Sequence, residues 1–172
     1  MHTEEIVARQ HKWDLRFLKL AADWSLHSKD PSTRTGAVVA RPDLSIVALG
    51  YNGFPPGVND DPARYLDRDL KYKLILHAEI NAMDSAREFL GGYTLYTWPF
   101  MPCSRCTAQV IKRGIRRCVS PELPLSTQLQ ERWGGDLKLA AMMLQEAGVQ
   151  LKLVPRQDLD FLGRLPKGVT LP

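Results

Sequence analysis

Three candidate metal ligands and one carboxylate stand in two short motifs, and any fold of this chain has to bring these motifs together. The first motif is His77-Ala78-Glu79, and the second is Pro102-Cys103-Ser104-Arg105-Cys106. An imidazole and two thiols are donors that zinc prefers in proteins. A structural zinc site closes four protein ligands around the metal, whereas a catalytic site has three and leaves the fourth position for water. Three ligands and a spare carboxylate therefore indicate a catalytic site.

Other uses of the same residues have to be weighed. Cys103 and Cys106 alone could form a redox pair, but that interpretation leaves His77 and Glu79 without a role. A closed structural zinc site could add Cys118 as a fourth ligand. Cys118 lies in an alternating apolar segment typical of a strand, where a lone cysteine is usually a small buried hydrophobe. We therefore expect one zinc ion per chain, bound by His77, Cys103 and Cys106.

The composition sets outer bounds on the class of protein. A chain of 172 residues with 44% hydrophobic and 24% charged residues predicts one domain over residues 1–172, with a weakly patterned tail from about 156. Without a long apolar run or a signal-peptide pattern, and with two of its three cysteines at metal spacing, we expect a cytoplasmic protein. The net charge of +4 suits a phosphorylated substrate but does not indicate nucleic-acid binding.

Hydrophobic periodicity predicts strands that alternate with helices. Helices are expected at 13–26, 75–89, 103–112 and 126–146, the last interrupted at Gly134-Gly135, and strands at 35–40, 45–50, 94–98, 116–120 and 149–154. The first two strands form a hairpin. Segment 59–73 has weak periodicity and is expected to be an insertion or flap with a short helix at 64–70. This order predicts an α/β fold, a three-layer α/β/α sandwich with a mixed five-stranded sheet opened by a β-hairpin.

The spacing within the motifs also constrains where the metal lies. Residues two apart on a regular helix point to nearly opposite sides, so His77 and Glu79 can flank a site only off the end of their helix. Cys103 and Cys106 share a face at the start of the next helix, where the helix dipole favours thiolates. We therefore expect two helix N-termini to meet at the metal.

The order of these motifs resembles that of the zinc-dependent cytidine deaminase superfamily, most closely its deoxycytidylate (dCMP) deaminase family. The matching segments are 28–31, 36–38, 50–55, 77–82, 102–106 and 114–115. The zinc motif is common to the superfamily, and Gly50-Tyr51-Asn52-Gly53 narrows the resemblance to the dCMP branch. Without the resemblance, this tetrapeptide could be only a hairpin exit. The resemblance implies a cytidine deaminase-like fold and hydrolytic deamination of dCMP to dUMP and ammonia.

Roles for single residues follow from this chemistry and from the resemblance. Zinc lowers the pKa of its water, and Glu79 would move a proton from that water to the pyrimidine ring and assist departure of ammonia. The resemblance implies that Asn52 holds the sugar hydroxyl and that Ala78 offers backbone contacts to the ring. The aromatic candidates for stacking on the base, each equally open to a plain core role, are Phe54, Tyr96, Trp98 and Phe100.

Basic side chains near these motifs are candidates for the substrate phosphate or for an effector nucleotide triphosphate. They are Lys29, Arg34, Arg64, Arg68, Lys71 and Lys73, most of them expected to be solvated surface, with Lys29 and Arg34 assigned to substrate binding. Ser32 departs from the family, whose members carry asparagine or arginine there. The densest basic patch is Lys112, Arg113, Arg116 and Arg117, interpreted as a helix C-terminus stabilised by positive charge. Apolar positions near Met142 and Met143 predict a homo-oligomer.

Three classes of function remain open at this point. We favour a dCMP deaminase over enzymes that act on related compounds such as 5-methyl-dCMP, cytidine or guanine. A deaminase acting on RNA or DNA would need a wider basic surface than this sequence offers. A noncatalytic module stabilised by zinc is the third alternative.

Overall fold

The computed structural model describes residues 3–122 and 127–159, which form a five-stranded mixed sheet in the order β2-β1-β3-β4-β5. The strands are β1 (Gly36–Ala40), β2 (Ile46–Tyr51), β3 (Thr94–Trp98), β4 (Arg117–Pro121) and β5 (Gln150–Val154). Strand β1 pairs antiparallel with β2 and with β3, whereas β3, β4 and β5 run parallel. The predicted hairpin and mixed sheet are confirmed.

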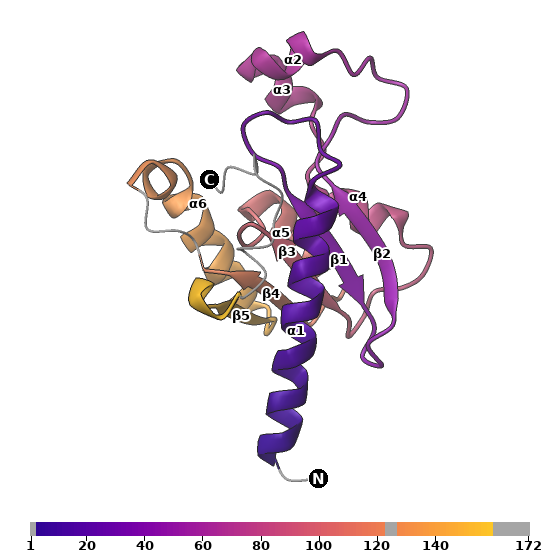
Figure 1. Cartoon of the computed structure of the whole chain (residues 1–172), viewed down its shortest axis with the longest axis vertical. Coiled ribbons are helices and arrows are strands. Elements are labelled where there is room, and N and C mark those ends of the chain that lie inside the picture. Colours follow the sequence, from indigo (N-terminus) through magenta and orange to yellow (C-terminus); the bar gives the residue numbers. More distant parts are fainter. Residues whose placement is uncertain (1–2, 123–126, 160–172) are drawn as a thin grey trace.

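Helices cover both faces of the sheet (Figure 1). They are α1 (Thr3–Ser25), α2 (Pro62–Leu66), α3 (Arg68–Leu74), α4 (Ala78–Ser85), α5 (Ser104–Lys112) and α6 (Thr127–Glu146), followed by the short 3-10 helix η1 (Arg156–Asp158). Successive side chains of β1 point to opposite faces of the sheet, and all of them are buried, so they contribute alternately to two cores. Val38 packs with Phe17 of α1, and Val39 packs with Met83 of α4 and Leu144 of α6. This confirms the three-layer α/β/α sandwich.

Two of the predicted helices have different bounds in the structure. Helix α1 begins at Thr3, ten residues before the predicted start. Hydrophobic periodicity does not reveal the first half of this helix, because that half is exposed and carries no apolar stripe. The second helix was predicted at 75–89 but spans only Ala78–Ser85. Leu76 instead pairs with Gly53 through two backbone hydrogen bonds of 2.9 and 3.1 Å, so the chain enters α4 in an extended conformation.

The other corrections concern the insertion and the last helix. The single short helix predicted at 64–70 is two helices, because Asp67 ends α2 and its side chain caps the Leu70 amide of α3. Helix α6 runs through Gly134-Gly135 without interruption, since burial of Leu137 and Leu144 offsets the low helix propensity of glycine. Its predicted first residue, 126, and the tail beyond 159 lie outside the described residues.

The predicted basic patch is divided among separate contacts. Only Lys112 and Arg113 lie at the C-terminal end of α5, where Arg113 donates to the Met83 carbonyl at 2.9 Å. Arg117 lies on β4, and its guanidinium donates two hydrogen bonds of 2.7 Å to Asp14, which is fully buried on α1. Lys152 of β5 donates to the same carboxylate at 2.8 Å. These ion pairs tie α1 to the sheet.

Gly50 allows the start of α4 to rest directly on β2. A Cβ atom at this position would lie 2.3 Å from the Ala78 carbonyl oxygen and 2.4 Å from the Ala82 amide nitrogen. Both neighbours are backbone atoms, which cannot rotate away. The glycine in the Gly50-Tyr51-Asn52-Gly53 segment is therefore required for the close approach of the helix that follows His77.

We expect Gly50→Ala to lower the free energy of unfolding by about 3 kcal/mol, because the added methyl overlaps two backbone atoms of α4. Chemical denaturation measures the change. Gly53→Ala is the matched control, since its nearest contact would be a Tyr51 ring carbon at an ordinary 3.8 Å. Equal stability of the two variants would contradict the packing role of Gly50.

None of the helices in the described parts of the chain is both long and apolar enough to span a membrane.

Candidate active site

The three predicted metal ligands meet where α4 and α5 begin. His77 is the residue before α4, Cys103 is the residue before α5, and Cys106 lies in the first turn of α5. The His77 Nδ1 atom lies 3.5 Å from Cys103 Sγ and 3.3 Å from Cys106 Sγ. Donor atoms at usual zinc distances and tetrahedral angles lie about 3.6 Å apart. Both the spacing and the donor types fit three corners of a zinc site, so the structure brings the three predicted ligands together.

The hydrogen bonds within this cluster set the protonation of its members. The hydrogen bond from Cys106 lowers the pKa of Cys103 to about 4, and the hydrogen bond with Cys103 raises the pKa of His77 to about 9. A metal requires thiolates and a neutral imidazole. Zinc therefore competes with protons for these ligands, and the affinity for zinc falls as the pH is lowered.

Glu79 lies in the first turn of α4, and its side chain is buried beside the ligands. It lines the same cavity as His77 and Cys103. His77 and Glu79 thus lie on either side of a site off the N-terminal end of α4, the arrangement expected from their spacing. Burial raises the pKa of the Glu79 carboxyl. A carboxyl with a raised pKa accepts a proton more readily near neutral pH than an exposed one, which suits a group that both takes and returns protons.

Cys118 does not take part in the metal cluster. It is fully buried on β4, in the core that α4, α5 and α6 cover. Burial raises the pKa of its thiol to about 12, so the sulfur is neutral at physiological pH. This confirms the expected role as a small apolar core residue.

We expect Cys118→Ser to keep the zinc content and activity of the wild type. The hydroxyl would be buried in an apolar core, so the free energy of unfolding should fall by about 1–3 kcal/mol. Metal analysis and thermal unfolding measure the two effects separately. A loss of zinc would show that Cys118 is a fourth ligand and would favour a closed structural site.

Asn52 lines the cavity, and its amide group holds the neighbouring loop at residues 30–35. Its Nδ2 donates to the Thr33 carbonyl at 2.9 Å and to Asp30 Oδ2 at 3.4 Å, and its Oδ1 accepts from the Thr35 amide at 2.8 Å. The side chain thus shapes the cavity wall. Ala78, the other residue expected near the substrate, is buried in the core at the start of α4 and offers only its backbone.

The aromatic candidates are divided between two places. Phe100 lines the cavity, with its ring centroid 6.0 Å from that of Trp133. Tyr96 and Trp98 belong instead to the core on the α1 side of the sheet, where Tyr96 packs on Phe17 at 4.8 Å. Alternate residues of a strand share a face, so both point away from α4 and α5. The stacking role expected of Trp98 is therefore corrected to a core role.

Three further candidates lie away from the cavity. Phe54 stacks on Tyr65 of the insertion, with 4.2 Å between ring centroids. Lys29 forms an ion pair with Asp60 at 2.5 Å, and Arg34 is exposed. None of the three lines the cavity beside the metal ligands. Phe54 and Lys29 instead tie two loops to the insertion, a contact that local sequence patterns do not reveal.

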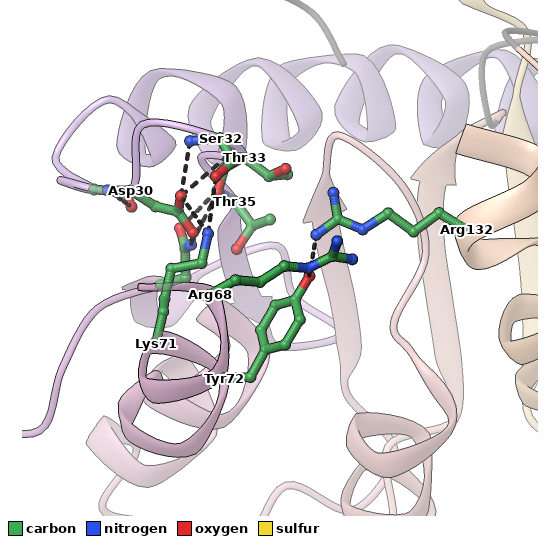
Figure 2. Close-up of polar contacts among 10 residues, drawn as sticks. Asp30, Ser32, Thr33, Thr35, Arg68, Lys71, Tyr72 and Arg132 are labelled. Atoms are coloured by element: carbon green, nitrogen blue, oxygen red, sulfur yellow. Dashed lines mark hydrogen bonds and ion pairs between the residues drawn. The ribbon is translucent and has the colours of Figure 1, made fainter. Parts of the chain in front are cut away.

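Lys71, one of the candidates for the phosphate or an effector, is buried against the same loop (Figure 2), although most of that set was expected to be solvated. Its ammonium group donates to Asp30 Oδ1 at 3.1 Å and to Ser32 Oγ at 2.8 Å. Asp30 Oδ1 also accepts from the Ser32 and Thr33 amides at 2.8 and 3.3 Å. The insertion is thereby anchored to the cavity wall, and the charge of Lys71 is neutralised by Asp30.

Several lining residues were not assigned to the cavity from the sequence, three of them on α3 and α6. Tyr72 comes from α3, and Arg132 and Trp133 come from α6. The sequence around α6 shows only helical periodicity, which does not indicate that one of its turns reaches the metal-binding loops. No motif signal marked these positions.

Known proteins resemble this chain over most of its length. Residues 11–121 match the family described as "Cytidine and deoxycytidylate deaminase zinc-binding region". An Aliivibrio fischeri protein, "Uncharacterized deaminase in luxG 3'region", is 38% identical over 144 residues, which cover 84% of this chain and 95% of the relative. The "Deoxycytidylate deaminase" of Mus musculus is 35% identical over 114 residues, 63% of this chain and 64% of the relative.

A solved structure shares the fold. The apo dCMP deaminase of the cyanophage S-TIM5 superposes with a TM-score of 0.61 at 22% identity, covering 90% of this chain and all of that chain. The same phage enzyme in complex with dCMP and dUMP gives a TM-score of 0.59 and 22% identity, with coverage of 90% and 99%. Because the family match extends over more than half of the sequence, this chain belongs to the zinc-binding cytidine and deoxycytidylate deaminase family.

Proposed function

We propose that this protein catalyses the zinc-dependent hydrolytic deamination of dCMP to dUMP and ammonia, as part of pyrimidine deoxynucleotide metabolism. The observation that carries the proposal is the cavity that Glu79 shares with the metal ligands His77 and Cys103. The names of the relatives narrow the substrate, since the mouse protein is a deoxycytidylate deaminase. The phage protein of similar fold was solved with dCMP and dUMP.

The proton transfers of this reaction are assigned to Glu79. Zinc held by His77, Cys103 and Cys106 would lower the pKa of a water, which would let that water attack C4 of the base near neutral pH. The buried Glu79 carboxylate takes a proton from the attacking water and gives it to ring N3. It then assists departure of the 4-amino group as ammonia. One carboxyl is thus acceptor first and donor later, and its raised pKa favours the accepting step.

The remaining contacts follow from the cavity wall. Phe100 and Trp133 offer aromatic surface for the pyrimidine ring. The Ala78 backbone, at the start of α4, offers contacts to the edge of the ring. Asn52 is assigned to the sugar hydroxyl. Because its amide already binds the loop at residues 30–35, it would reach the sugar only through the remaining hydrogen-bonding capacity of its oxygen.

A substrate panel tests the proposal by ammonia release. The panel contains cytosine, cytidine, deoxycytidine, CMP, dCMP, 5-methyl-dCMP, dCTP and guanine. We expect the highest kcat/KM for dCMP. Equal kcat/KM for deoxycytidine would remove the nucleotide assignment, and a higher value for 5-methyl-dCMP or guanine would replace dCMP by that compound.

We also propose that the chain forms a homo-oligomer through its α6 side. Leu139 and Met142, three residues apart on α6, are 45% and 47% exposed, and Leu153 of the edge strand β5 is 42% exposed. Met143, the other predicted contact, is only half-exposed. Sedimentation of the wild type and of the double variant Leu139→Glu, Met142→Glu tests this surface, because two buried charges should dissociate the assembly.

Binding of a nucleotide triphosphate effector and a cytosolic location of the protein stay predictions.

A further inference from the structure

Two arginines from different parts of the chain meet at one phenol oxygen (Figure 2). Arg68 of α3 donates from Nε to Tyr72 Oη at 3.2 Å. Arg132 of α6 donates from its guanidinium to the same oxygen. Both guanidinium groups also lie near the Tyr72 ring, with Cζ atoms 5.4 and 5.9 Å from its centroid. Arg68 and Arg132, which are 64 positions apart in sequence, thus both bind the neutral hydroxyl group of Tyr72.

These two positive charges have no counter-charge among the described residues. Three other arginines are paired with carboxylates, namely Arg41 with Glu88, Arg113 with Asp84 and Arg117 with Asp14. Neither Arg68 nor Arg132 forms an ion pair in the parts of the chain that the structure describes. Like charges that converge on one oxygen repel each other, and a bound anion would offset this repulsion.

The pKa of Tyr72 reports the same excess of positive charge. Burial alone would raise the pKa of this phenol, but the hydrogen bonds from Arg68 and Arg132 lower it below its usual value. Lys71, the next cation, does not add to the excess because Asp30 neutralises it. The uncompensated charge is therefore that of the two guanidinium groups.

The cluster stands at the exposed end of the active-site cavity. Tyr72 and Arg132 line the same cavity as Glu79 and His77. Arg68 and Arg132 also line the adjoining depression next to Ser32. Glu79 is buried, whereas Arg68, Tyr72 and Arg132 are exposed, so an anion can approach from solvent while a ring attached to it extends toward the metal ligands.

Trp133 belongs to the same cavity wall as Arg132. It follows Arg132 on α6 and lines the cavity. Its Nε1 atom is buried and has no hydrogen-bond partner among the residues that the structure describes. The Trp133 ring therefore offers the cavity an aromatic surface, with the Arg132 Cζ atom 5.4 Å from its centroid.

We propose that Arg68, Tyr72 and Arg132 bind the 5′-phosphate of the nucleotide substrate, an inference that rests on the proposed function. Guanidinium groups match phosphate oxygens in geometry and charge, and the Tyr72 hydroxyl donates a further hydrogen bond. The phosphate contact thus comes from α3 and α6, in place of Lys29 and Arg34. Selection of a nucleotide over its nucleoside is then a property of the 59–73 insertion and of α6.

Kinetics of Arg132→Gln and Arg68→Gln test the phosphate site. Loss of a charge-assisted hydrogen bond to phosphate should raise the KM for dCMP roughly tenfold to a hundredfold in each variant. The KM for deoxycytidine, which has no phosphate, should change by less than about twofold. Lys138→Gln is the matched control, because it removes one positive charge from an exposed position on α6 that lines a different depression. We expect it to leave both values unchanged.

Binding to a protein that cannot turn over separates this inference from the proposed function. Calorimetry on zinc-loaded Glu79→Gln should give a lower Kd for dCMP than for deoxycytidine, and adding Arg132→Gln should remove most of that difference. If the wild type released ammonia from neither compound, the deaminase assignment would fail while this binding difference would still report the phosphate site. If Arg132→Gln raised the Kd for dCMP and for deoxycytidine equally, or left the Kd for dCMP unchanged, the inference would be overturned.

Discussion

Glu79→Gln is expected to lower kcat by about a hundredfold to ten-thousandfold, while the protein retains its zinc. Glutamine has nearly the same shape as glutamate, so the buried position beside Cys106 stays filled. It cannot take a proton from water or return one to the base. Ammonia release under saturating substrate measures the loss, and metal analysis of the same preparation measures the zinc.

The matched control for this variant is Asp84→Asn, which removes an exposed carboxylate from the same helix. Asp84 pairs with Arg113 at the surface, so this change should leave turnover near the wild-type value. Zinc loss in Glu79→Gln would mean that the carboxylate is itself a ligand. Turnover within a few fold of the wild type would instead remove Glu79 from the proton transfers.

The metal ligands were predictable from sequence because they stand in two short motifs. Cys103 and Cys106 are held by one helix turn, and His77 stands at the start of another helix, so donor type and spacing identify the ligands although the fold has to bring the two helices together. What the sequence does not specify is which face of the sheet receives these helices. Trp98 was therefore assigned to the cavity although its face of β3 packs under α1.

The rest of the cavity depends on contacts between distant segments. Lys71 is buried because Asp30, 41 positions away, accepts from it. Without that pairing, a lysine in a polar stretch is expected to be solvated. Arg132 likewise reaches the cavity because α6 packs against α5, an arrangement that the helical period of α6 does not contain. Substrate selectivity is thus less visible in sequence than the reaction type, since the zinc ligands stand in short motifs and the residues proposed for the phosphate do not.

Cys103→Ser is expected to lose most of the bound zinc and, with it, activity and stability. With two remaining ligands, the site binds metal far more weakly, because a serine hydroxyl does not replace a thiolate on zinc. A ligand present at about a thousandfold its Kd stabilises the folded state by about 4 kcal/mol, which corresponds to roughly 8–16 °C in Tm for a domain of this size. Cys103→Ser should lose this stabilisation.

Cys118→Ser is the control for this variant, because it makes the same chemical change at another buried cysteine. Its zinc content should stay at the wild-type level, so the two variants separate loss of a ligand from burial of a hydroxyl. A chelator supplies the second comparison. It should lower the Tm of the wild type and of Cys118→Ser to that of their metal-free forms, and it should leave Cys103→Ser almost unchanged. Full zinc occupancy in Cys103→Ser would mean that another donor completes the site and that the three-ligand assignment is wrong.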